Sequence, residues 1–146
     1  MNTSMPAVWL YWLWAATAGL WLFGLSMVLT PDLIRWAFSL MLYGDGQHVA
    51  STFGAPANDY IRLLHGVLGA VMFGWGVMIA MVLRRAVAQG QPESINWILL
   101  PLLAWYIPDT IFSLYTGFWQ NAVLNTVFLL VFLVPLLALK RHLSRV

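Results

Sequence analysis

Four long runs of apolar residues divide the sequence, and the stretches between them are richer in polar residues, glycine and proline. At a rise of about 1.5 Å per residue, each run is long enough to cross about 30 Å of hydrocarbon as a helix. The pattern therefore predicts an all-α, polytopic membrane protein, a bundle of four transmembrane helices in one domain over residues 1–146. The predicted spans are residues 7–29, 60–83, 95–116 and 119–139.

The connection between the first two spans, residues 31–59, has the pattern of a loop that contains a short helix. The helix signal is the sequence Thr30-Pro31-Asp32. Thr30 is expected to be the N-cap, Pro31 the first helical residue, and Asp32 an acid that interacts favourably with the helix dipole. Its polar residues then share one helical face, and apolar residues cover the rest. We expect a short amphipathic helix in the plane of the membrane interface.

Other short signals predict how the spans end and pack. Asn58 or Asp59 is expected to cap the second span. The stretch "GFWQN" leaves room only for a tight turn, so the third and fourth spans should be antiparallel neighbours. Gly66, Ala70 and Gly74 recur at every fourth position, which is the small-xxx-small pattern of close helix contact.

Composition and charge support a membrane protein and suggest its orientation. The chain is 62% hydrophobic and 8% charged, whereas soluble domains carry about 25% charged residues. The net charge of +2 is too small to indicate a nucleic-acid partner, and no Lys or Arg precedes the first apolar run, so no cleaved signal peptide is expected. The positive-inside rule predicts cytoplasmic N- and C-termini, because one side of the membrane holds Arg84, Arg85, Lys140, Arg141 and Arg145.

One acidic residue, Asp109, falls inside a predicted span, about 12 Å from its outer end. A carboxylate in hydrocarbon costs at least about 2.5 kcal/mol, so Asp109 should face the bundle and find partners. Arg62 is the best charged partner, because its long side chain could reach down from the second span. The other candidate ligand-binding side chains in this outer layer are His65, Tyr106, Ser113, Asn121 and Asn125, and His65, Asn125 and the nearby hydroxyls are the expected hydrogen-bond partners of Asp109.

Two interpretations of this outer polar layer stay open. Its side chains could only hold the helices together, as polar groups in membranes often do. They could also form a ligand, proton or catalytic site, the default hypothesis for an ionisable residue inside a membrane. The sequence has no cysteine and no nucleotide-loop, Ser-His-Asp or metal-protease pattern, so we expect no metal site, and the cofactor is unknown.

Two stretches, "GVLGAVMFGWGVMIA" and "DTIFSLYTGFWQNAVLN", resemble a group of small, mostly uncharacterised four-helix proteins of the bacterial inner membrane that are DoxX-like in layout. Some DoxX-like proteins are small subunits that work with quinone-linked oxidoreductases. The resemblance implies a multi-pass protein of the bacterial inner (plasma) membrane with an accessory or apolar-ligand role. It implies no cofactor ligand at any named position.

Three functions are compatible with these features. The first, which we favour, is an accessory subunit or a bundle that binds a lipid or quinone-like molecule near Asp109, alone, as a homo-oligomer or within a larger membrane complex. The second is a membrane enzyme for an apolar substrate, with Asp109 as general acid or base, His65 as its proton partner and Arg62 orienting an anionic head group. The third is a proton-coupled oligomeric transporter in which Asp109 titrates.

Overall fold

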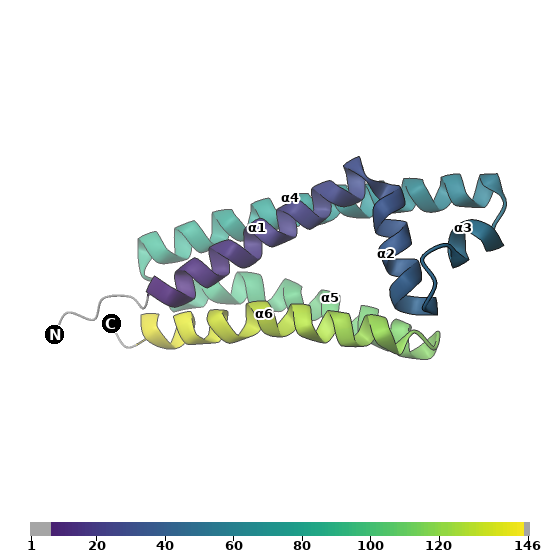
Figure 1. Cartoon of the computed structure of the whole chain (residues 1–146). Coiled ribbons are helices and arrows are strands. Elements are labelled where there is room, and N and C mark those ends of the chain that lie inside the picture. The colour runs from purple at the N-terminus through teal and green to yellow at the C-terminus, as the bar shows by residue number, and fades with distance from the viewer. Residues whose placement is uncertain (1–6, 145–146) are drawn as a thin grey trace. The chain divides into compact units, whose positions relative to one another are not determined.

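The computed structural model describes residues 7–144, and this part of the chain is helical without a strand. Four helical segments are long and apolar enough to cross a membrane: α1, α4, η1 with α5, and α6. The predicted all-α fold with four spanning helices is therefore confirmed, and the protein is a small integral membrane protein. The elements are α1 (Ala7–Leu29), α2 (Pro31–Tyr43), α3 (His48–Thr52), α4 (Ala55–Gln89), the 3₁₀-helix η1 (Pro92–Ile95), α5 (Asn96–Tyr115) and α6 (Trp119–Leu143) (Figure 1).

The predicted boundaries agree well for α1 and α5 and least for α4. This helix has 35 residues and begins at Ala55, so the prediction that Asn58 or Asp59 caps it was wrong. Both residues lie inside the helix, and the Asn58 N–H donates to the carbonyl of Gly54 at 3.1 Å. Pro56 is tolerated because a helix needs no N–H partner in its first turn.

The spanning helices leave most of their apolar surface exposed. Between 22% and 39% of the most apolar 18-residue window of each segment is buried. Exposed apolar side chains on this scale are unfavourable in water, and the hydrocarbon of a bilayer removes that cost. The exposure therefore agrees with the membrane assignment that the sequence pattern gives.

The chain divides into two compact units. The terminal unit comprises Met1–Ala18 and Val77–Val146, and the middle unit comprises Gly19–Gly76. Each unit thus contains one part of α1 and one part of α4, and each is described by itself below. The prediction of one domain over residues 1–146 stays a prediction.

In the terminal unit, α5 and α6 form an antiparallel hairpin, as the short turn predicts (Figure 1). The turn is a Schellman motif in which Gly117 adopts a φ of +82°. The Phe118 N–H donates to the carbonyl of Ser113 at 2.8 Å, and the Gly117 N–H donates to that of Leu114 at 3.1 Å. These two bonds satisfy carbonyls at the end of α5 and fix the register between the two helices.

Two side-chain bonds hold other parts of the terminal unit together. The indole N–H of Trp12 in α1 donates to the carbonyl of Val131 in α6 at 3.0 Å. At the open end of the hairpin, the Lys140 ammonium donates to Asn96 Oδ1 at 2.7 Å. The buried apolar core of this unit includes Leu13, Ile79, Leu83, Ile98, Leu102, Phe132, Leu136 and Leu139.

In the middle unit, α1 and α4 approach closely at two glycines. A Cβ on Gly69 would lie 2.5 Å from the carbonyl oxygen of Gly24 and 2.6 Å from the Cβ of Met27. A Cβ on Gly66 or Gly74 would meet no heavy atom of the described chain within 4 Å. A Cβ on Gly76 would likewise lie 2.5 Å from Cδ1 of Trp21 in α1, so the contact between α1 and α4 uses Gly69 and Gly76 rather than the predicted stripe of small residues.

Candidate functional site

Asp109 takes part in a hydrogen-bonded cluster that joins α5 to α6. Its Oδ1 accepts a bond of 3.2 Å from Asn121 Nδ2, whose other N–H donates to Ser113 Oγ at 2.8 Å. The Ser113 hydroxyl donates to the main-chain carbonyl of Asp109 at 2.7 Å and lies 3.3 Å from Oδ1. The structure thus brings together Asp109, Ser113 and Asn121, three of the residues that the sequence singles out.

Asn125 lies one helical turn beyond Asn121 in α6. It is 4% exposed, and its Nδ2 has no hydrogen-bond partner among the described residues. A buried amide without a partner is unfavourable by about 1–3 kcal/mol. The polar layer on the hairpin therefore has hydrogen-bonding capacity that the described contacts do not use.

Tyr106 and Thr126 form a second link between the two helices. The Thr126 hydroxyl donates its single proton to the carbonyl of Ala122 at 2.8 Å. The contact of 3.1 Å between Tyr106 Oη and Thr126 Oγ1 must therefore have the tyrosine hydroxyl as its donor. Thr110, one turn from Tyr106, has a buried hydroxyl without a hydrogen-bond partner in the described part of the chain.

The residues that carry these hydroxyls line an open groove on the hairpin, which we call the hairpin groove. Its volume is about 420 Å³, within the usual range of small-molecule sites. The lining positions on α5 are four residues apart, and those on α6 follow the pattern i, i+3, i+4, i+7, i+8, so each helix contributes one face. The hairpin groove is lined by Tyr106, Thr110, Leu114, Trp119, Ala122, Val123, Thr126 and Val127.

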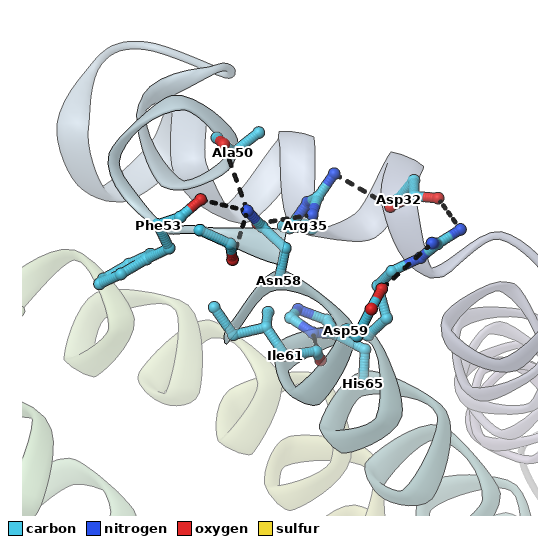
Figure 2. Close-up of polar contacts among 10 residues, drawn as sticks. Asp32, Arg35, Ala50, Phe53, Asn58, Asp59, Ile61 and His65 are labelled. Carbon is cyan, nitrogen blue, oxygen red and sulfur yellow. Dashed lines mark hydrogen bonds and ion pairs between the residues drawn. The ribbon is translucent and has the colours of Figure 1, made fainter. Parts of the chain in front are cut away.

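The middle unit has a separate charged site, drawn in Figure 2. The Asp32 carboxylate in α2 contacts two guanidinium groups, that of Arg35 at 3.0 Å and that of Arg62 at 2.7 Å. Arg62 also lies 3.8 Å from the carboxylate of Asp59. This site is an open cleft of about 490 Å³, and we call it the arginine cleft; it is lined by Asp32, Arg35, Ala50, Phe53, Ala55, Asn58, Asp59 and Arg62.

Asn58 connects three helices around the arginine cleft. Its Oδ1 accepts a bond of 2.8 Å from the Arg35 guanidinium in α2. Its Nδ2 donates to the carbonyl of Phe53 at 2.6 Å and lies 3.3 Å from that of Ala50. Figure 2 shows Asn58 between Arg35 and these carbonyls, so one α4 side chain holds both α2 and α3.

His65 makes its described contacts within the middle unit. Its Nδ1 lies 2.8 Å from the carbonyl of Ile61, and because a carbonyl only accepts, Nδ1 carries the proton. The ring also meets Phe38 of α2 edge-on, with centroids 6.1 Å apart. These contacts position the imidazole between α4 and α2.

The predicted polar layer is thus distributed over both units. Arg62 and His65 belong to the middle unit, whereas the hairpin residues around Asp109 belong to the terminal unit. Arg62 has carboxylate partners in its own unit, Asp32 and Asp59. The proposed contacts of Arg62 and His65 with Asp109 stay predictions, and so does a site that all the candidate residues share.

Sequence reasoning did not find the arginine cleft. The spacing of three residues from Asp32 to Arg35 and from Asp59 to Arg62 was the available signal, since such pairs lie on one helical face. Sequence reasoning also missed the role of Thr126 in the hairpin groove. Alignment of Tyr106 and Thr126 across a tight turn could have indicated that pair.

No protein-family model matches the chain, and no similar curated protein or solved structure was found. The resemblance to DoxX-like proteins and the bacterial origin therefore stay predictions. Among residues 7–144, no group of three His, Cys, Asp or Glu side chains is placed to hold a metal ion. The functional argument consequently depends on the geometry of the hairpin groove and the arginine cleft.

Proposed function

We propose that the protein binds an apolar molecule that has a carbonyl oxygen at its head, a lipid or a quinone-like compound, in the hairpin groove. The observation that carries this proposal is a groove with apolar walls and a buried hydroxyl, that of Thr110, without a partner. In the proposed complex the Thr110 side chain, whose Oγ1 is covered in the unliganded structure, turns about χ1 so that its hydroxyl donates to the ligand carbonyl. The tail of the ligand lies along Leu114, Trp119, Val123 and Val127.

Hydrogen bonding explains why the ligand should present an acceptor at Thr110. The neighbouring hydroxyls have donated their protons already, Tyr106 to Thr126 and Thr126 to the carbonyl of Ala122. Thr110 is therefore the hydroxyl of the groove whose proton has no described acceptor. A ligand carbonyl would supply that acceptor and offset an unfavourable free energy of about 1–3 kcal/mol.

The apolar walls alone would not select a ligand. In a bilayer, lipid tails are as apolar as leucine, so covering Leu114 or Val123 gives no hydrophobic preference for one molecule over another. Close packing against the Trp119 ring and the single hydrogen bond at Thr110 would then decide which molecule stays bound. This reasoning makes Thr110 the most informative position to change.

The cluster around Asp109 supports this function rather than one in proton transfer. Its described partners, Ser113 and Asn121, both hold α5 against α6 on the hairpin that forms the groove. In this proposal Asp109 maintains the shape of the site, and the protein acts as an accessory component of a larger membrane complex or a homo-oligomer. The distribution of Lys and Arg supports a multi-pass orientation with both termini in the cytoplasm.

Native mass spectrometry of the full chain, extracted in mild detergent, tests the proposal. We expect a co-purified apolar molecule that contains a carbonyl, and Thr110→Val should weaken its retention about fivefold, because one hydrogen bond of about 1 kcal/mol is lost. Thr116→Val is the matched control, since Thr116 is exposed at the hairpin turn and does not line the groove. Equal retention by the two variants, or a wild-type protein without any bound molecule, would contradict the proposal.

A further inference from the structure

The arginine cleft has the size of a ligand site and walls of both charges. Two arginines and two aspartates line its volume of about 490 Å³, together with Asn58 and the aromatic ring of Phe53. All of these residues belong to the middle unit, so this site is independent of the hairpin groove. The formal charges of Arg35, Arg62, Asp32 and Asp59 cancel, which disfavours a ligand with a large net charge of either sign.

The two charges are not evenly distributed around the cleft. The guanidinium groups of Arg35 and Arg62 share the single carboxylate of Asp32, at 3.0 Å and 2.7 Å. Asp59 lies 3.8 Å from Arg62, and its side chain is 74% exposed. Near Asp32 the cleft therefore has more guanidinium N–H donors than one carboxylate can accept. At Asp59 it has a carboxylate that is largely exposed.

The geometry points to a zwitterionic ligand, a phosphate monoester or diester that carries a primary ammonium group, as in a phosphoethanolamine head group. Arginine binds phosphate oxygens through paired N–H donors, so the phosphate would contact Arg35 and Arg62. The ammonium would donate to the carboxylate of Asp59. A head group that ends in a quaternary ammonium has no N–H donor, and one that ends in an uncharged alcohol has no cation. Both should therefore bind less well.

Phe53 gives the cleft an apolar border. Phe53 is 46% exposed, and the small side chains of Ala50 and Ala55 also line the cleft. The acyl chains of a phospholipid could lie against this ring while the head group occupies the cleft. The same chemistry is also present in free phosphoethanolamine, so the two sources have to be distinguished by experiment.

Titration of the delipidated full-length protein in detergent, followed by native mass spectrometry, tests this inference. The probes are phosphatidylethanolamine, phosphatidylcholine, phosphatidylglycerol and water-soluble phosphoethanolamine. We expect phosphatidylethanolamine to bind about tenfold more tightly than the other two lipids, a difference that one charge-assisted hydrogen bond explains. Binding of the soluble compound with equal strength would assign the site to the free molecule, and binding of the lipid alone would assign it to the membrane; either result supports the zwitterion.

Three variants separate recognition from folding. Asp59→Asn should abolish the preference for phosphatidylethanolamine over phosphatidylglycerol, and Arg62→Gln should weaken every phosphate-containing probe. Arg85→Gln is the control, because Arg85 is exposed near the other end of α4 and does not line the cleft. Equal affinity of the wild-type protein for the three lipids, or an unchanged preference in Asp59→Asn, would overturn the inference. Thr110→Val should leave the lipid preference unchanged, so failure here is distinguishable from failure of the hairpin groove.

Discussion

Replacing Asn58 with alanine removes the side chain that connects α2, α3 and α4. The variant loses the charge-assisted bond from Arg35, at 2.8 Å, and the bond to the carbonyl of Phe53, at 2.6 Å. A charge-assisted bond of this kind contributes about 1.5 kcal/mol to stability, and a neutral one contributes about 1 kcal/mol. Because Asn58 is half-buried, water replaces part of the lost hydrogen bonding. We therefore expect the free energy of local opening around α3 to fall by about 2 kcal/mol, which makes the open state about 30-fold more populated.

Hydrogen exchange measured by mass spectrometry reports this local opening directly. The amides of Ser51 and Phe53, which donate to the carbonyls of Gln47 and Val49 in α3 and its caps, should exchange about 30-fold faster in Asn58→Ala. Gln47→Ala is the control, since Gln47 is exposed and its side chain does not line the arginine cleft. If exchange in α3 were the same in both variants, Asn58 would not be what holds this helix, and the reasoning would be refuted.

Three further predictions concern the stability of each unit in detergent, measured by tryptophan fluorescence during thermal or chemical unfolding. Asp109→Asn should unfold almost like the wild type because the amide still offers an acceptor to Asn121, whereas Asp109→Leu should lose about 1–2 kcal/mol; equal effects would contradict the cluster. Gly69→Val should lose about 1–3 kcal/mol by clashing with the backbone of α1, whereas Gly66→Val meets open space and should be tolerated; the reverse order would refute the α1–α4 contact. Lys140→Met should lose about 1.5 kcal/mol with its bond to Asn96, and Arg141→Met should not, so identical midpoints would exclude that link.

The spanning helices could be predicted because the length of an apolar run is enough to determine a transmembrane helix. The ends of α4 could not, because its first turn "APAND" and its last residues "RRAVAQ" are polar enough to lie outside hydrocarbon. Helices continue beyond the apolar run wherever backbone bonds are satisfied, and hydropathy does not report those bonds. The helix therefore has 35 residues where the apolar pattern predicts 24.

The hairpin cluster around Asp109 and the arginine cleft also differ in how well the sequence predicts their contacts. A tight turn fixes the register of two neighbouring helices, so a bond between Asp109 and an amide of α6 could be expected, but the sequence favoured Asn125 and the structure has Asn121 in that place. The contact of Arg62 with Asp32 spans 30 positions and depends on how the loop before α4 folds. That loop is held by backbone carbonyls bonded to Asn58, a kind of contact that leaves no periodic pattern in the sequence.

Single cysteines test directly whether the hairpin groove holds an apolar molecule with a carbonyl oxygen, because the chain has no cysteine of its own. Val123→Cys places a thiol in the groove wall, and Leu124→Cys places one at the same depth on α6 outside the groove. Their rates of alkylation by N-ethylmaleimide are compared with and without a monoacylglycerol or a short-chain benzoquinone whose ring carbons are all substituted, so that the quinone does not itself alkylate the thiol. We expect at least one of these probes to slow alkylation at position 123 and not at position 124. Equal rates at both positions with either probe would contradict it.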